Sequence, residues 1–551
     1  MTTKKTDQNA KQAQQAGTET IQQATKTMQQ FFSTSQKQSK HQLALAKDWA
    51  EIFTGKSELQ PDKGDRRFKG DTWNSNPFFR SMMQSQLALQ NRVNDIVSDM
   101  GLSHTNQERM RKVSANMLDA LAPTNTLAGN PEAIKKALDT GGKSLFEGSK
   151  NYFDDLMNNG GMPSQVDKNA FNVGDNVAAT PGQVVYRTEM LELIQYQPTT
   201  ARVHKRPLLM VPPQINKYYI YDLAPGRSLI EYAVSQGFQV FAVSWRNPTK
   251  ENSDWGFENY IKALEDATEI LCEISRSKDL NVLGACSGGI TVTTLMAYLA
   301  ARDIKRINSL SLMVSVLDTG GTSDTSLGLF ANRDVLQLAK KASSTAGLLE
   351  GKKLGQVFAW LRPNDLVWSY WVNNYLLGNQ PPSFDLLYWN SDTTNMPAQL
   401  HSDFINLIEQ NPLVEPGMLK IDGTPIDLKK LSNDTYVIAG TTDHITPWEG
   451  CYRTVNLLGG KTDFVLSSSG HVQAIVNPPG NPKAKFYTTD KPCTDSDEYL
   501  KNATENTGSW WEHWQAWLEE RSGEKIAAPK KLGNANYPPI QTAPGSYVKQ
   551  A

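Results

Sequence analysis

Cys286 stands in the motif Gly284-Ala-Cys-Ser-Gly288, after a short apolar run and before residues 291–300, which are predicted to be helical. A G-x-C-x-G pattern between a strand and a helix is typical of a nucleophile elbow, with cysteine in place of the usual serine. Glycines suit such a turn because a side chain there would meet neighbouring backbone. The pattern therefore predicts a nucleophile at a helix N-terminus, although a lone cysteine in a short match can equally be a small core residue.

A cysteine nucleophile needs a base, because a thiol of pKa 8.5 is only about 3% thiolate at neutral pH. Asp443 and His471 follow Cys286 along the chain, each just after a predicted strand. This chain order, nucleophile then acid then histidine, is that of the α/β-hydrolase triad. We therefore predict that the three side chains converge. His444 is the rival base, but its neighbour Asp443 is poorly placed to orient it, so we expect His444 to contact the substrate or to support the triad.

Attack of a thiolate on an acyl group also requires two backbone N–H groups that stabilise the oxyanion. One is predicted to be that of Ser287, which follows the nucleophile. The other should follow the strand at residues 207–211, where Pro212 and Pro213 have no N–H to offer. The donor is therefore expected to be Gln214 or a residue just after it.

The predicted fold class is α/β, an α/β-hydrolase domain over residues 166–551 with a cap insertion. Apolar strands at 207–211, 238–244, 282–283, 310–316, 435–439 and 463–466 alternate with helical segments, after a hairpin at 183–186 and 190–196. This alternation predicts a mostly parallel sheet covered on both faces. Residues 319–431 interrupt it over too great a length for a loop, so they should form the cap. Its aromatic segments either line an apolar channel or form the cap's own core.

The chain before this domain is predicted to be different in character. Residues 1–40 are rich in Gln, Lys and Thr and are expected to be disordered or a marginal helix. Residues 41–165 have helical periodicity and are predicted to form a mostly helical N-terminal domain. An apolar stripe near its start can either lie on a hydrophobic surface or pack on the body of the protein; it comprises Leu43, Leu45, Trp49, Ile52 and Phe53.

Composition excludes several classes of protein. The net charge of −1 argues against nucleic acid as a partner. Four scattered cysteines predict neither a disulfide framework nor a metal site, and they favour a reducing cytoplasm. The start of the chain shows no secretory signal, and no run of 18 apolar residues predicts a transmembrane segment.

Several motifs together resemble those of the polyhydroxyalkanoate synthases, and the length and further blocks look most like the class II, medium-chain-length type. The similarity covers roughly residues 60 to 551. The motifs that carry it are Gly284-Ala-Cys-Ser-Gly-Gly289, Pro212-Pro-Gln-Ile-Asn-Lys-Tyr-Tyr219, Ser244-Trp-Arg-Asn-Pro248, Arg362-Pro-Asn-Asp-Leu366, Asp443-His-Ile-Thr-Pro-Trp448, and Gly470-His471 with Asn477-Pro-Pro479.

The resemblance implies that Cys286, Asp443 and His471 are the catalytic triad of a polymerase of (R)-3-hydroxyacyl-CoA, with CoA as the leaving group and a growing polyester as the product. Whether Asp443 or His471 activates the attacking hydroxyl stays open. The resemblance further implies a homodimer on the surface of cytoplasmic polyester granules, with no metal or redox cofactor. Residues 1–55 match nothing expected of that class.

Two other functions compete with this interpretation. A thiol esterase or polyhydroxyalkanoate depolymerase would use the same triad with water as the acceptor. A granule-binding protein that kept the fold without catalysis would not need Cys286.

Overall fold

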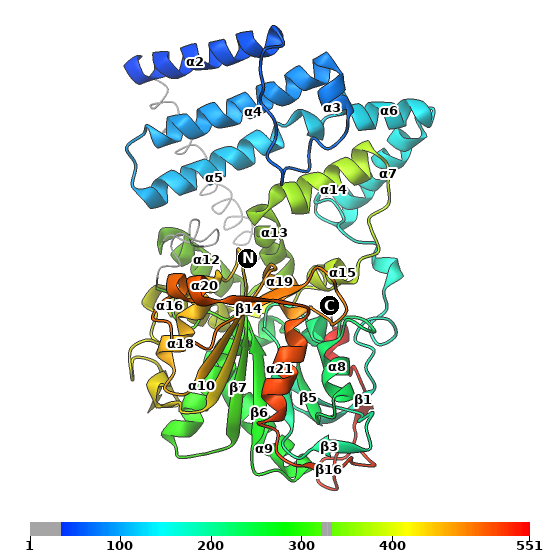
Figure 1. The fold of residues 1–551 in the computed structure, drawn as a ribbon. Coiled ribbons are helices and arrows are strands. Elements are labelled where there is room, and N and C mark those ends of the chain that lie inside the picture. The colour runs from blue at the N-terminus through cyan, green and yellow to red at the C-terminus, as the bar shows by residue number, and fades with distance from the viewer. Residues whose placement is uncertain (1–34, 321–327, 329–332, 551) are drawn as a thin grey trace, which may run out of the picture. The chain divides into compact units, whose positions relative to one another are not determined.

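The computed structural model describes residues 35–320, 328 and 333–550, and its contacts divide the chain into two compact units. Unit 1 contains the chain up to Gly161 together with Pro363–Asn379, and unit 2 contains Met162–Arg362 and the chain from Gln380 onward. Most of the segment predicted as disordered or marginal, residues 1–34, lies outside the described residues. Figure 1 shows the elements of both units.

Unit 1 is helical. Asn130 caps its helix α6 by accepting from the N–H groups of Glu132 and Ala133, as its sequence pattern predicts. The helices of the first part of the unit are α2 (Ser35–Phe53), α3 (Thr72–Ser75), α4 (Pro77–Ser98), α5 (His104–Ala120), α6 (Pro131–Asp139) and α7 (Lys143–Asn158).

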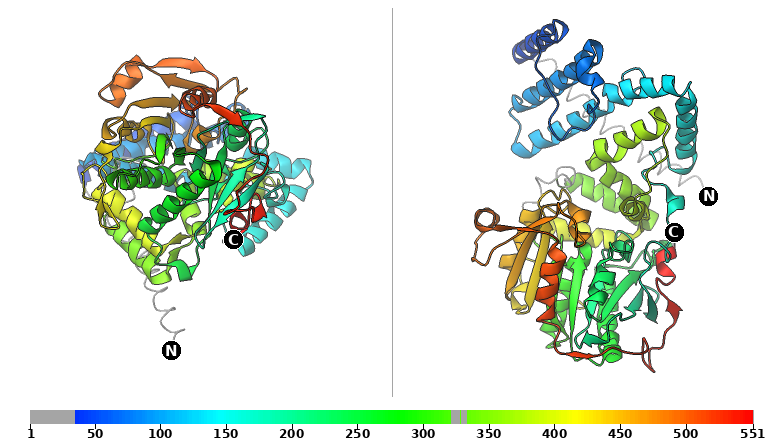
Figure 2. Two further views of the ribbon diagram at one scale, coloured as in Figure 1. Left: turned by 90° about the horizontal axis from the view of Figure 1, so that it is seen from below. Right: turned by 45° about the vertical axis from the view of Figure 1, so that its right-hand side comes forward.

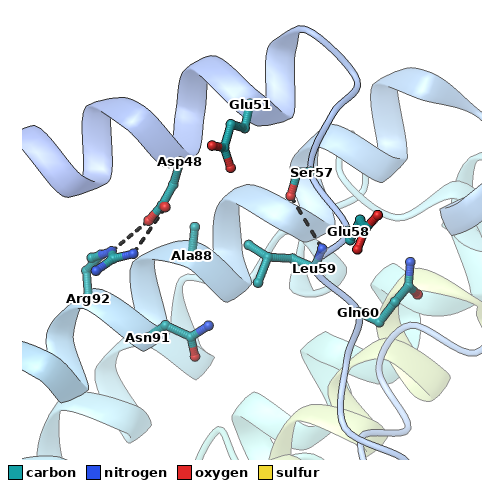
Figure 3. A pocket seen from close by; sticks show the side chains of 9 residues that line it. All are labelled: Asp48, Glu51, Ser57, Glu58, Leu59, Gln60, Ala88, Asn91 and Arg92. Atoms are coloured by element: carbon teal, nitrogen blue, oxygen red, sulfur yellow. Dashed lines mark hydrogen bonds and ion pairs between the residues drawn. The ribbon is translucent and has the colours of Figure 1, made fainter.

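The apolar stripe of α2 is partly packed on the protein and partly exposed, so each of the two alternatives left open by the sequence applies to some of its residues. Ile52 is buried, whereas Leu43 and Phe53 are 72% and 75% exposed. Trp49 and Phe53 of α2 line an apolar groove of about 360 Å³ together with Phe78 of α4. A second, polar hollow of about 410 Å³ lies on the same pair of helices, where Arg92 donates to Asp48 at 2.6 Å (Figure 3).

The segment Pro363–Asn379 is the unexpected part of unit 1. The sequence assigns it to the cap, yet it packs with the N-terminal helices through the short helices η6 (Asn364–Trp368), α14 (Ser369–Trp371) and η7 (Val372–Leu376). Asn364 donates to Asp119 at 2.7 Å, and the hydroxyl of Tyr375 donates to Asp155 at 2.8 Å. The backbone of Tyr375 approaches α7 so closely that a Cβ at Gly148 would overlap its carbonyl oxygen.

We predict that Gly148→Ala destabilises the protein. Alanine in a helix is normally favoured over glycine by about 0.5–1 kcal/mol, but here the overlap with Tyr375 should cost about 1–3 kcal/mol and reverse the sign. The thermal unfolding midpoint should therefore fall. Gly64→Ala is the matched control, because a Cβ at Gly64 meets nothing within 4 Å. Equal midpoints for the two variants would contradict the close packing.

Unit 2 is built on an 11-stranded sheet, counted over the described residues. Its six central strands run parallel in the order β13-β12-β7-β6-β4-β5, and antiparallel strands extend it at both edges. The strands are β1 (Gly182–Arg187), β2 (Leu191–Tyr196), β4 (Leu208–Val211), β5 (Val240–Trp245), β6 (Leu280–Ala285), β7 (Ile307–Met313), β12 (Asp434–Gly440), β13 (Thr462–Ser467), β14 (Lys485–Thr488), β15 (Thr504–Thr507) and β17 (Gln541–Thr542).

Helices cover both faces of this sheet, as the near-continuous apolar strands predict (Figures 1 and 2). Along β4, Leu209 and Val211 pack into one core cluster and Leu208 and Met210 into the other, because successive side chains point to opposite faces. The helices are α8 (Leu229–Ser235), α9 (Phe257–Ser275), α10 (Ser287–Ala301), α17 (Trp448–Tyr452), α18 (Thr454–Leu457), α19 (His471–Ile475), α20 (Ser496–Asn502) and α21 (Trp510–Glu519). This is the predicted α/β-hydrolase architecture.

The stretch between β7 and β12 has its own secondary structure. Within unit 2 it contains α12 (Arg333–Ala346), α13 (Gly351–Leu361), α15 (Asp385–Ser391) and α16 (Ala398–Gln410), with the short strands β8 (Leu348–Leu349), β9 (Met396–Pro397), β10 (Lys420–Ile421) and β11 (Thr424–Pro425). We use the term cap segment for residues 389–395, which follow the middle of α15. The small strands β3 (Arg202–His204) and β16 (Lys525–Ala527) pair at the other end of the unit.

Candidate active site

Cys286 lies between the end of β6 and the start of α10, in a backbone conformation that L-residues rarely adopt, with φ of 50° and ψ of −122°. The turn is as tight as its glycines predict. A Cβ at Gly284 would lie 2.7 Å from the Cα of Gly289, and one at Gly288 would lie 2.6 Å from the carbonyl oxygen of Pro212. Glycine is therefore required on both sides of the nucleophile by steric contact.

The end of the neighbouring strand β7 holds the elbow in place. The N–H of Cys286 donates to the carbonyl of Met313 at 2.9 Å. The hydroxyl of Ser315 then donates to the carbonyl of Cys286 at 3.0 Å. Both backbone groups of the strained residue are thus bonded by the last residue of β7 and by Ser315 just after it, which offsets part of the strain.

Asp443 and His471 follow β12 and β13, so both reach the same edge of the parallel sheet as Cys286. Nδ1 of His471 lies 2.7 Å from Oδ2 of Asp443. Thr446 donates its N–H to Oδ1 and its hydroxyl to Oδ2 of the same carboxylate. The N–H of Ile445 also donates to Oδ1, so both carboxylate oxygens are occupied.

The buried pair shifts the pKa of both members. Burial lowers the pKa of His471, but attraction to Asp443 and hydrogen bonds with Asp443 and Cys286 outweigh it and raise the pKa to about 10. Burial raises the pKa of Asp443, but the charge of His471 and the bonds from His471 and Thr446 bring it below its ordinary value. The carboxylate is therefore held ionised, and the imidazole is made a strong base.

Cys286 is the third predicted residue, and it lies close enough to His471 to contribute to the raised pKa of the imidazole. Cys286 is half-buried, and among the described cysteines it is unpaired, as are Cys272, Cys451 and Cys493. The structure thus brings together a thiol, an imidazole and a carboxylate in the order that nucleophilic catalysis uses.

Two tryptophans far along the chain fix the short helix that begins at His471. The indole of Trp510 donates to the carbonyl of Ala474 at 2.7 Å, and that of Trp511 donates to Ile475 at 3.0 Å. These carbonyls belong to the last turn of α19, where no intrahelical donor is left. Sequence reasoning treated this tryptophan cluster only as core, because apolar spacing does not reveal which carbonyl an indole reaches.

The predicted oxyanion residues lie together beside the elbow. Ser287 is the first residue of α10, so its N–H lacks an intrahelical acceptor. Gln214 is buried and bonded to α10, because its side chain accepts from Ser287 at 2.7 Å and donates to Thr291 at 2.9 Å. The N–H of Gln214 lies 3.3 Å from the Ser287 hydroxyl.

His444 lies next to Asp443 and is half-buried. Cys451 of α17 is fully buried, and burial raises its pKa well above the ordinary value, with Asp443 and Cys286 contributing to the shift. This second thiol was not singled out by its sequence. Its environment suppresses the thiolate.

Within the described residues no cluster of three or more His, Cys, Asp or Glu side chains could hold a metal ion. None of the described helices is both long and apolar enough to cross a membrane.

Comparison with known proteins places this site in a family. Residues 64–233 match the family described as poly-beta-hydroxybutyrate polymerase N-terminus, and residues 209–478 match the alpha/beta hydrolase fold. Poly(3-hydroxyalkanoate) polymerase 1 of Ectopseudomonas oleovorans is 51% identical over 93% of this chain and 91% of its own length. The chain belongs to the poly(3-hydroxyalkanoate) polymerase family.

Other polymerases extend this relationship. Poly(3-hydroxyalkanoate) polymerase 2 of the same organism is 46% identical over 92% of this chain and 90% of its own length. The polymerase subunit of Cupriavidus necator is 40% identical over 93% of this chain and 87% of its own length. As a member of this family, the polymerase is an acyltransferase that makes polyester, and the family resemblance noted in the sequence is confirmed.

We predict that the stability difference between the wild-type polymerase and Asp443→Asn depends on pH. The pKa of His471 is raised in the folded state, so the pair's contribution is fully present below about pH 6.5 and is lost as pH rises towards 10. The lowered pKa of Asp443 keeps the contribution present above about pH 4. Thermal unfolding midpoints should therefore differ most near pH 6 and least near pH 10.

Asp427→Asn is the matched control for this comparison. Asp427 caps a short helix by accepting from the N–H of Lys429 and has no histidine partner. Its difference from wild type should be similar at pH 6 and pH 10. A pH-independent difference for Asp443→Asn would contradict the coupling between Asp443 and His471.

Proposed function

We propose that the polymerase joins medium-chain-length (R)-3-hydroxyacyl units from their CoA thioesters through covalent intermediates on Cys286, with His471 as the base and Asp443 as its partner. The observation that carries the proposal is the hydrogen bond between His471 and Asp443, together with the influence of the nearby Cys286 on the pKa of His471. Each of the three residues follows one of three parallel strands. The medium chain length rests on the motif resemblance.

The first half of the reaction loads the enzyme. His471 takes the proton of the Cys286 thiol, and the sulfur attacks the thioester carbonyl. The N–H of Ser287 and an N–H of the loop at Gln214 stabilise the tetrahedral oxyanion. The bond to the CoA sulfur then breaks, CoA leaves with the proton held by His471, and the acyl group remains on Cys286 as a thioester.

The second half lengthens the chain. The 3-hydroxyl of another unit attacks the enzyme thioester, an ester bond forms, and the sulfur of Cys286 is released. A cysteine suits this sequence because thioester exchange is nearly balanced in free energy, whereas a serine ester would leave the acyl group less reactive. Water would divert the intermediate to a free acid, so a dry site favours polymerisation over hydrolysis.

Of the two residues left open as activator of the hydroxyl, the structure favours His471. Both oxygens of Asp443 are already engaged, by two N–H groups and by Thr446 and His471. The low pKa of Asp443 also makes it a weak proton acceptor. Its role in the proposal is to orient the imidazole and to stabilise its charged form. The proposed reaction uses no metal or redox cofactor.

We predict that Cys286→Ala lowers the rate of CoA release by at least about 10³-fold without changing the thermal unfolding midpoint by more than a few degrees. The measurement uses (R)-3-hydroxyacyl-CoA of short and medium chain length, with the polymer recovered at the end. Burial of four extra methylenes supplies about 3 kcal/mol, so the medium-chain substrate should be preferred by about 100-fold in kcat/KM.

Cys451→Ala is the matched control, since it removes a buried thiol near the same site. Its CoA release should stay within about tenfold of the wild type. Free hydroxy acid without polymer would favour the thiol esterase or depolymerase alternative. Absence of CoA release in the wild type, with granule binding retained in Cys286→Ala, would favour the non-enzymatic one.

We further propose that the apolar groove of unit 1 binds the surface of the polyester granule in the cytoplasm. The groove exposes aromatic side chains, with Phe53 and Phe78 at 75% and 63% exposure, and exposed apolar surface of this kind is typical of interaction sites. The product of this family is itself a polyester, which offers an apolar surface. The homodimer stays a prediction from the resemblance.

We predict that Phe53→Ser combined with Phe78→Ser reduces binding of the polymerase to isolated polyester granules by about tenfold or more, because two large apolar contacts are lost. Co-sedimentation measures the bound fraction. Leu500→Ser, a similarly exposed apolar residue of unit 2, is the control and should bind as wild type does. Equal binding by the wild type, the double variant and Leu500→Ser would contradict a role of the groove in granule binding.

A further inference from the structure

The loop after β4, which leads into the predicted oxyanion residues, has most of its carbonyls bonded to side chains or backbone of other elements. The hydroxyl of Tyr221 donates to the carbonyl of Val211 at 3.0 Å, and the indole of Trp245 donates to that of Pro212 at 3.1 Å. Thr394 donates its hydroxyl to the carbonyl of Gln214 at 3.1 Å and its N–H to that of Ile215 at 3.2 Å. The indole of Trp389 donates to the carbonyl of Lys217 at 2.7 Å. The orientation of the peptides that carry these carbonyls is thereby set from outside the loop.

Three of these donors, from Trp389 and Thr394, belong to the cap segment, residues 389–395. The same segment forms an antiparallel bridge between Thr393 and Asn216. The hydroxyl of Tyr219 donates to Asp392 at 2.8 Å, and burial raises the pKa of this carboxyl group. The cap segment therefore pairs with the loop along its length, in a buried contact, and does not merely cover it.

Thr394 makes three hydrogen bonds to two consecutive peptides of the loop. Its side chain bonds the carbonyls of Gln214 and Ile215, and its N–H bonds that of Ile215. Thr394 is 3% exposed, so water does not compete for these bonds. Because a trans peptide places C=O and N–H on opposite sides, the N–H of Ile215 and the N–H of Asn216 must face away from Thr394.

The other side of the loop belongs to the elbow helix. The Gln214 side chain bonds Ser287 and Thr291 of α10, so the loop is held by the cap segment and by α10 together. The N–H of Gln214 already has the Ser287 hydroxyl as an acceptor at 3.3 Å. In the part of the chain that the structure describes, no hydrogen-bond acceptor is found for the N–H of Ile215.

We propose that Thr394 is a positioning residue for acyl transfer: by holding the carbonyls of Gln214 and Ile215 it aims the loop's N–H groups at the oxyanion formed on Cys286. The inference deepens the proposed function and rests on it. Thr394, a residue of the cap segment, would thus help to stabilise the transition state by orienting the backbone of the loop. It also implies that a displaced cap segment leaves the oxyanion site incomplete.

The test compares Thr394→Val with Thr394→Ser in the full-length polymerase. Valine keeps the shape and the backbone N–H but removes the hydroxyl. We expect kcat for CoA release from a medium-chain (R)-3-hydroxyacyl-CoA to fall about 10- to 100-fold, with KM within about twofold, because only the charge developed in the transition state loses support. Thr394→Ser should stay within about threefold of wild type.

Alkylation of Cys286 by iodoacetamide separates a positioning role from a structural one. If Thr394 only supported the structure of the site, its loss would also change the alkylation rate. This reaction needs the thiolate and His471 but develops no oxyanion, so its rate should be the same in wild type and Thr394→Val. Thr393→Val is the matched control: it alters the neighbouring residue of the same bridge, for whose hydroxyl no partner is found among the described residues, and it should keep wild-type kcat.

Three outcomes would overturn the inference: wild-type kcat in Thr394→Val, an equal loss in alkylation rate, or a Thr394→Ser variant as slow as the valine one. If the valine variant does not fold, Thr394→Ala takes its place with the same expectations. Cys286→Ala is assayed in parallel. If Cys286→Ala releases CoA within about tenfold of the wild-type rate, the proposed function is wrong. If Cys286→Ala is inactive and Thr394→Val is unimpaired, only the role of Thr394 is wrong.

Discussion

The active site depends on one strained residue. Cys286 has a positive φ, which costs about 1–3 kcal/mol for a residue with a Cβ and persists only where the surroundings determine it. Its surroundings do so on each side: β6 ends directly before it, α10 begins directly after it, and its two backbone groups are bonded by Met313 at the end of β7 and by Ser315 just beyond. The conformation places the sulfur beside His471, so the chemistry rests on a turn that the unstrained chain would avoid.

The second requirement of the site is a buried charge that stays paired. Asp443 has a fully buried side chain, and an isolated carboxylate there would be neutral. Three hydrogen bonds from Ile445 and Thr446, together with the imidazole, keep it ionised, and the ionised carboxylate in turn raises the pKa of His471. Burial, which acts against each charge alone, strengthens the attraction between them.

The sequence predicted the parallel part of the sheet, and it placed the candidate triad residues at the ends of strands, because the signals for both are local. Apolar runs of strand length with helices between them allow few arrangements, and the motifs at the strand ends follow directly. The exception among the strands is instructive. A strand was expected at residues 310–316, but β7 ends at Met313 because Val314 turns to a φ of 45°. The apolar character continues past the turn because Ser315 and Val316 stay buried near the elbow.

Other features could not be read locally. Thr394 is an ordinary polar residue in the sequence, and its importance comes from two carbonyls about 180 residues earlier. The segment 363–379 has the aromatic content of a cap core, but composition does not say which core a helix joins. Its assignment depends on Asn364, Trp371 and Tyr375 finding partners in the N-terminal helices. Pairings between distant parts of the chain are set by shape and register, which a single sequence does not display.

The placement of Pro363–Asn379 also makes the two units inseparable by a single cleavage. The chain enters unit 1 first at its beginning and again in the middle of the catalytic region, so neither unit is a continuous stretch of sequence. Removal of everything up to Gly161 would leave the indole of Trp371 and the phenol of Tyr375 without the groups they bond, and would expose their rings to solvent. The helical unit therefore cannot be removed by deleting the N-terminal residues alone. A polymerase truncated in this way would keep residues 363–379 without the helices against which they pack.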